Sequence, residues 1–156
     1  MTQIEQYRKA LILAQLYHGD QLRIMGQYEG KSYFEYHILP VCRSVATYPS
    51  KTLAALHDII EDTSCTYDFL EAAGFSPIVI KRLELLTRTD ERPYKKYIQR
   101  IAESNDRAVI EVKIADIINN LSQSTSIGHE KRYAEALAEL LPVSSGPQIP
   151  DNTLYP

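Results

Sequence analysis

The sequence is poor in the residues that mark disulfide-rich, low-complexity and membrane-spanning proteins. Its 156 residues include two cysteines, six glycines and eight prolines, which excludes a disulfide framework and a collagen-like or low-complexity chain. No segment approaches the run of roughly 18 apolar residues that a membrane helix needs. The first residues are polar and run directly into a helical pattern, so we do not expect a signal peptide.

Positive charge is also in deficit. Lys and Arg number 17 against 20 Asp and Glu, which gives a net charge of −3 and a pI of about 5.8. We therefore expect no general binding to nucleic acid through a basic surface. The lack of a long apolar run likewise predicts no membrane partner. Cys42 and Cys65 have no partner in a C-x-x-C motif, so we expect two buried or half-buried thiols in a protein of the reducing cytoplasm.

The hydrophobic spacing is that of helices, with no clear period-2 strand pattern. We predict an all-α fold, a compact helical bundle over residues 1–141, followed by an extended tail over 142–156 in which four residues are proline. A loop over 20–33 contains Gly26 and Gly30, and it either lets backbone approach a ligand or simply connects two helices. The expected helices span 4–18, 36–45, 51–62 with Ser50 as its cap, 67–73, 77–86, 94–103, 106–122 and 129–141.

Four polar side chains interrupt apolar helix faces, which is costly unless they are paired or bind a metal. His37 begins one helix, His57-Asp58 lies within an apolar run, and Asp116 lies between Ile114-Ala115 and Ile117-Ile118. Imidazole and carboxylate groups together suit Mn²⁺, Fe²⁺ or Zn²⁺. The pattern therefore indicates a site for a divalent metal.

Two further carboxylates follow the His-Asp doublet. Glu61 and Asp62 lie one helical turn beyond His57 and Asp58, so we expect all four side chains to crowd one side of a single helix. Clustered carboxylates raise one another's pKa toward the range in which a general acid or base works. The alternative, a solvated acidic helix end, does not suit so apolar a helix.

Taken in order, these motifs resemble the HD superfamily of metal-dependent phosphohydrolases. The resemblance is closest to the alarmone hydrolase domain of RelA/SpoT-type proteins and their small stand-alone relatives. It covers about residues 10–122 and rests on the segments 18–23, 36–41, 54–63, 85–88 and 112–121. The most specific parts are His57-Asp58-x-x-Glu61-Asp62-Thr63 and Lys113-x-x-Asp116-x-x-x-Asn120-Leu121.

The resemblance implies an HD-domain bundle and an enzyme that removes pyrophosphate from the 3′ position of a guanosine tetra- or pentaphosphate. It implies Mn²⁺ held by His37, His57, Asp58 and Asp116, with Glu61 and Asp62 activating the attacking water. It further implies that Arg23, Lys113 and Asn120 serve the nucleotide substrate. Other cations that offer positive charge to an anionic substrate are Lys31, Arg88, Arg92, Lys95 and Lys96.

Several positions depart from the family pattern. Ile24, Ile117 and Ser122 stand where the family commonly has basic residues, and Tyr33–Tyr36 replaces the usual Pro-Tyr before the ligand histidine. The metal and water machinery is intact while the nucleotide-binding residues differ. Adenine alarmones such as ppApp are therefore candidate substrates in addition to ppGpp. The alternatives are an HD nucleotidase for other (deoxy)nucleotides and a non-catalytic nucleotide-binding module.

Two tyrosines near a lysine pair have two possible roles. Tyr94 and Tyr97 flank Lys95-Lys96, where they either stack on a base or pack half-buried on a helix. The sequence does not predict an oligomeric state.

Overall fold

A computed structural model describes residues 1–88 and 93–145 of the chain, and in these residues the fold is all-α, as predicted. Their only β-type pairing is an isolated antiparallel bridge between Leu22 and Ser32. The elements are α1 (Gln3–His18), the π-helix η1 (Phe34–Ile38), α2 (Leu39–Ser44), α3 (Tyr48–Leu56), α4 (Ile59–Asp62), α5 (Tyr67–Ala72), α6 (Pro77–Leu86), α7 (Tyr94–Glu103), α8 (Arg107–Gln123) and α9 (Ile127–Ser144).

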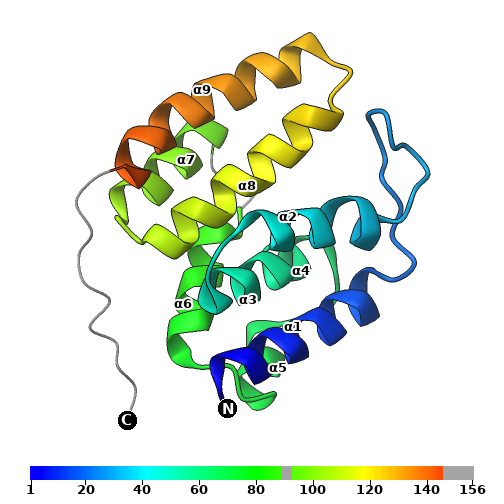
Figure 1. The fold of residues 1–156 in the computed structure, drawn as a ribbon, viewed down its shortest axis with the longest axis vertical. Coiled ribbons are helices and arrows are strands. Elements are labelled where there is room, and N and C mark those ends of the chain that lie inside the picture. The colour runs from blue at the N-terminus through cyan, green and yellow to red at the C-terminus, as the bar shows by residue number, and fades with distance from the viewer. Residues whose placement is uncertain (89–92, 146–156) are drawn as a thin grey trace.

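Helix α8 runs through the middle of the molecule (Figure 1). It packs against α9 and α7 on one side and against α2, α3 and α6 on the other. Its N-terminus is fixed by Asp106, whose carboxylate accepts hydrogen bonds from the backbone of Ala108 and Val109 at 3.1 and 3.3 Å, as N-cap residues do. Because the apolar residues of α8 are packed in the core, its polar residues are held in fixed positions.

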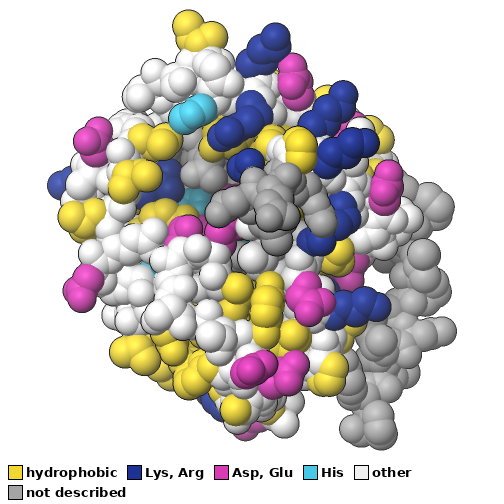
Figure 2. All heavy atoms as spheres, turned by 180° about the vertical axis from the view of Figure 1, so that it is seen from behind, with side chains coloured by type: hydrophobic (Ala, Val, Ile, Leu, Met, Phe, Trp, Pro, Cys, Tyr) yellow, Lys and Arg dark blue, Asp and Glu magenta, His cyan; other side chains and the backbone are white. Residues whose placement is uncertain are grey.

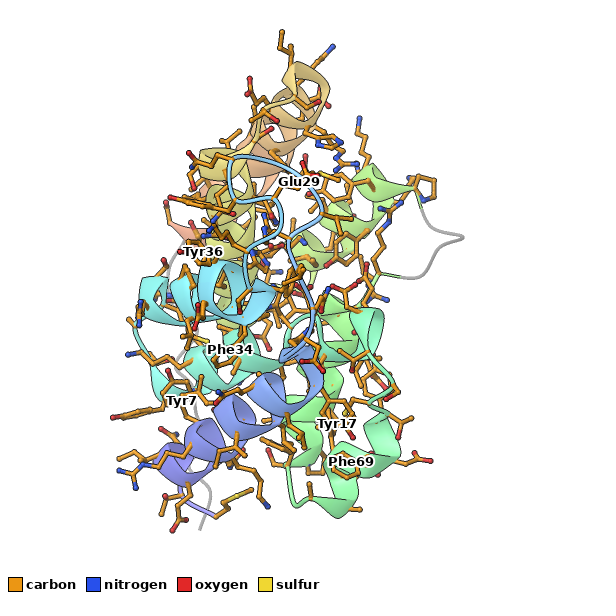
Figure 3. All side chains as sticks on the ribbon, turned by 90° about the vertical axis from the view of Figure 1, so that its right-hand side faces the viewer. Tyr7, Tyr17, Glu29, Phe34, Tyr36 and Phe69 are labelled. Carbon is orange, nitrogen blue, oxygen red and sulfur yellow. The ribbon has the colours of Figure 1, made fainter. Side chains whose placement is uncertain are left out.

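The glycine-containing loop folds back on the end of α8. Figure 3 shows it rising from α1, with Glu29 near its top, and returning to η1. The backbone N–H of Gln27 donates to the carbonyl of Gln123 at 3.0 Å, which satisfies an acceptor at the C-terminus of α8. Gly26 has φ +85°, and a Cβ there would lie 2.4 Å from the same carbonyl. The close approach therefore requires glycine at position 26.

Three details of the predicted helices are wrong. The helix expected over 51–62 is two helices, broken at His57 and Asp58. Thr47, not Ser50, caps α3, because the Thr47 hydroxyl accepts from the backbone N–H of Ser50. Helix α9 continues through Pro142 to Ser144, so the extended tail does not begin at 142. The rest of that tail, 146–156, lies outside the described residues.

Cys42 and Cys65 are both buried free thiols, as predicted. Across the described segments, no helix combines the length and the apolar character needed to cross a bilayer.

Candidate metal centre and nucleotide pocket

The break between α3 and α4 places two side chains at the centre of the site. His57 ends α3, and Asp58 precedes α4 with φ −105° and ψ −3°, in a sparsely populated region where active-site residues often lie. The His57 Nδ1–H donates to the carbonyl of Ala54 at 2.8 Å. This side-chain bond competes with the helical bond of that carbonyl, and it fixes the ring so that Nε2 faces His37.

His37 reaches the same point from the π-helix η1. Such wide turns interrupt helices most often at functional sites. The ring is buried, and its Nδ1–H donates to Oδ1 of Asn119 on α8 at 2.7 Å. Because an oxygen acceptor holds Nδ1 in both His37 and His57, both rings keep the Nε2 lone pair for the centre of the site.

The four predicted ligand side chains meet there. The two Nε2 atoms lie 3.2 Å apart. Asp58 Oδ2 lies 2.9 Å from Nε2 of His57 and 3.3 Å from Nε2 of His37, and these three side chains form a group suited to a metal ion. Asp116 Oδ1 faces the same imidazoles at 3.3 and 3.8 Å.

This donor set fits a divalent cation. Ligands about 2.1 Å from a shared ion are themselves separated by about 3.0–3.4 Å, close to the distances between these atoms. Each histidine also has the oxygen partner on its other nitrogen that metal-binding histidines usually have. Although burial lowers the pKa of His37 and His57, the nearby Asp116 and Asp58 outweigh it and raise the pKa of both rings. The centre therefore stabilises positive charge.

Asp116 is held by two donors on its own helix. The Lys113 ammonium donates to Oδ2 at 2.7 Å, and the Asn120 amide donates to Oδ1 at 2.7 Å. Burial alone raises the pKa of the Asp116 carboxyl, but Lys113 and the two histidines lower it well below its usual value. Lys113 and Asn120 thus orient Asp116, a candidate metal ligand, in addition to the substrate role that the family resemblance implies.

Glu61 and Asp62 lie beside the centre rather than in it. Glu61 Oε2 accepts from the backbone N–H of Arg88 at 2.9 Å, and Asp62 Oδ2 accepts from the Gln21 amide at 3.3 Å. Partial burial, reinforced by the charge of Asp58, raises the pKa of both carboxyls. They are therefore better proton acceptors than ordinary surface carboxylates.

A pocket of about 200 Å³ opens next to Asn120, between the glycine-containing loop, the end of α8 and the start of α9. Arg23 lines it and is itself buried, with its guanidinium donating to Asn120 Oδ1 at 3.1 Å. The other lining residues are Met25, Gly26, Gln123, Ser124, Thr125, Ser126, His129 and Tyr133. Figure 2 shows basic, acidic and histidine side chains gathered around a hollow on this side of the molecule.

Comparison with known proteins agrees with this geometry. No family model matches the chain. The chain is 28% identical over 142 residues to the bifunctional (p)ppGpp synthase/hydrolase SpoT of Escherichia coli (strain K12). It is equally similar to the guanosine-3′,5′-bis(diphosphate) 3′-pyrophosphohydrolases of Escherichia coli O157:H7 and Shigella flexneri. These matches cover 83% of this chain but 20% of each relative, so the chain spans about a fifth of the curated relatives' length.

The structural match covers most of both chains. The fold superimposes with a TM-score of 0.69 on a solved structure described as a metazoan ortholog of SpoT that hydrolyzes ppGpp, over 90% of this chain and 86% of that one at 18% identity. The chain therefore has the fold of that hydrolase, and its sequence is similar to the RelA/SpoT-type hydrolases. The predicted fold class and family resemblance are thereby confirmed.

Within this fold, the structure brings together nearly all the residues that the sequence singled out. The three positions at which basic residues of the family are replaced do not join this group. Ile24 is 82% exposed, Ile117 is fully buried in the core, and the Ser122 hydroxyl donates to the carbonyl of Asn119. None of the three lines the pocket. Arg92, another predicted cation, lies outside the described residues.

Tyr97 is buried and donates its hydroxyl to the carbonyl of Leu86, so it belongs to the core rather than to a base-stacking surface. Tyr94 is half-buried, with the guanidinium of Arg132 4.8 Å from its ring centre.

The residues that support the site were missed from sequence. Asn119, Gln21 and Tyr33 touch His37, Asp62 and Asp58, respectively. Tyr133 and His129 reach the pocket from α9. Polar residues on helix ends or in loops look like solvated positions in a sequence, and only the tertiary packing shows their partners.

Proposed function

We propose that the protein is an HD-type, Mn²⁺-dependent phosphohydrolase that removes the 3′-pyrophosphate from an alarmone of the (p)ppGpp or (p)ppApp type. The observation that carries the proposal is the centre itself, where two imidazole Nε2 atoms 3.2 Å apart face the carboxylates of Asp58 and Asp116. The names of the SpoT-type relatives support the substrate class. His37, His57, Asp58 and Asp116 would hold the ion.

When bound, such an ion lowers the pKa of water and offsets negative charge on phosphate. The protein side chains supply the proton transfers. Hydrolysis requires the attacking water to lose a proton and the 3′-oxygen of the ribose to gain one as pyrophosphate leaves. Glu61 and Asp62 lie beside the centre with raised pKa values, so this pair accepts and returns the proton.

The pocket at Arg23 is the candidate site for the purine. Its volume of about 200 Å³ is below the range of roughly 300–1,000 Å³ typical of pockets for drug-sized ligands, which suits a base better than a whole nucleotide. Gln123 lines the pocket, and its buried Oε1 has no hydrogen-bond donor. The amino group of guanine or adenine would satisfy it.

The deciding experiment is to give metal-free protein Mn²⁺ and then, separately, ppGpp, ppApp and a deoxynucleoside triphosphate, with chromatographic identification of the products. We expect pyrophosphate and a nucleoside 5′-diphosphate from at least one alarmone. Glu61→Gln is the matched control, because it preserves the size of the side chain and removes the base. Cleavage of the deoxynucleotide alone would favour the nucleotidase alternative, and binding without any product would favour the non-catalytic module.

A further inference from the structure

Tyr33 stands between the metal centre and the nucleotide pocket. It ends the glycine-containing loop and directly precedes η1. Its hydroxyl donates to Asp58 Oδ2 at 2.5 Å, and its ring centre lies 4.9 Å from the ring of His37. On the pocket side, the guanidinium carbon of Arg23 lies 5.5 Å from the centre of the same ring. One side chain thus contacts groups from both sites.

The Tyr33 hydroxyl bonds to the Asp58 oxygen that faces the two histidines. Asp58 Oδ2, which accepts from Tyr33, is the same oxygen that lies 2.9 Å from Nε2 of His57. Apart from the two histidines, Tyr33 is the one side chain in the described parts of the chain seen to contact this carboxylate. Asp116 has two such donors. The orientation of Asp58 therefore depends on a single phenol.

The phenol is the donor in the hydrogen bond between Tyr33 and Asp58, because an ionised carboxylate has no hydrogen to donate. A carboxylate that binds a metal is usually oriented by such a hydrogen bond, and loss of the partner typically weakens metal binding or activity about 10- to 100-fold.

The ring acts on Arg23. Cations are attracted to the face of an aromatic ring within about 6 Å of its centre, and the observed distance of 5.5 Å falls in that range. Arg23 also donates to Asn120, which in turn donates to Asp116. Arg23 is thus fixed by Tyr33 and Asn120, the residues that orient the two metal-site carboxylates.

We propose that Tyr33 is a positioning residue with two separable parts: its hydroxyl orients Asp58 for the metal, and its ring orients Arg23 for the nucleotide. This inference rests on the proposed function. It assigns a role to a residue of Tyr33–Tyr36, the segment that replaces the Pro-Tyr usual in the family.

The hydroxyl is tested by Tyr33→Phe, which keeps the ring. Titration calorimetry of metal-free protein with Mn²⁺ should show a dissociation constant raised about 10- to 100-fold, while KM at saturating Mn²⁺ stays within twofold of the unchanged protein. Tyr28→Phe is the matched control, because Tyr28 lies in the same loop and pairs its ring with Tyr36 at 4.8 Å. Equal Mn²⁺ affinity in Tyr33→Phe and the unchanged protein would overturn the role of the hydroxyl.

The role of the Tyr33 ring is tested with substitutions that largely keep the shape of the ring. Phenylalanine and increasingly fluorinated phenylalanines placed at position 33 weaken the negative face of the ring step by step. At saturating Mn²⁺, KM should rise in step with fluorination, by about 2- to 10-fold in total, and kcat should change little. A KM that does not change along the series would overturn the role of the ring. If the unchanged protein bound no Mn²⁺ or cleaved no alarmone, the proposed function itself would fail.

Discussion

The pair Lys113–Asp116 allows the structural and metal-binding roles of one residue to be separated. The ammonium and carboxylate are 2.7 Å apart, with side chains 13% and 8% exposed. Removal of one partner from such a buried pair leaves an uncompensated charge and costs about 3–5 kcal/mol. We expect Asp116→Ala to cost about 3 kcal/mol, the lower end, because Lys113 also lies 5.0 Å from the ring centre of Tyr97. That is a large part of a typical stability of about 5–15 kcal/mol.

The double variant Asp116→Ala/Lys113→Met provides the control. It removes both charges, so we expect it to recover most of the lost stability, yet to bind no Mn²⁺ at concentrations that saturate the unchanged protein. Urea unfolding in the presence of a chelator measures the first effect, and metal analysis of the folded double variant measures the second. A loss below about 1 kcal/mol in Asp116→Ala would refute the buried-pair reasoning. Full metal occupancy in the double variant would remove Asp116 from the ligand set.

Three further predictions follow from the site and the core. Glu61→Gln should retain its Mn²⁺ and lose turnover by about 10²-fold or more; unchanged turnover in a product assay would count against Glu61 as a proton acceptor. Arg23→Lys should raise KM strongly, because an ammonium cannot replace a planar guanidinium, whereas an unaltered KM would mean that charge alone acts there. Burial raises the pKa of the Cys42 thiol to about 12 and also raises that of Cys65. A thiol reagent should therefore label both only after unfolding, and rapid labelling of the native protein would contradict this burial.

The centre of the site could be predicted because its residues conflict with their surroundings. His57 and Asp116 lie within apolar helical runs, where an unpaired polar group is unfavourable, and the structure brings both to one point. The residues around the centre carry no such conflict. Asn119 is an ordinary polar residue near a helix end, and only the position of η1 shows that it orients His37.

The helix boundaries show a similar limit. Apolar spacing predicts one helix over 51–62, because periodicity is insensitive to a two-residue break. At the break, the His57 ring donates to the carbonyl of Ala54, and the apolar pattern cannot reveal such a local competition with the helical hydrogen bond. At the other end, Pro142 predicts a stop for α9. Pro142 removes one backbone donor and crowds the preceding turn, and α9 ends two residues beyond it.

Helix α8 sets the spacing between the two halves of the proposed site. Asp116 belongs to the metal centre and Gln123 to the pocket, seven residues further along the same helix. At a rise of about 1.5 Å per residue, these positions are about 10 Å apart along the axis. Asn120 lies between them and bonds to Asp116 on one side and to Arg23 on the other. Since α8 is also buried in the core through Val109, Val112 and Ile117, the helix cannot slide without disrupting that packing. A nucleotide whose base occupies the pocket is therefore held at a fixed distance from the metal centre, and the position of its phosphates follows from that distance.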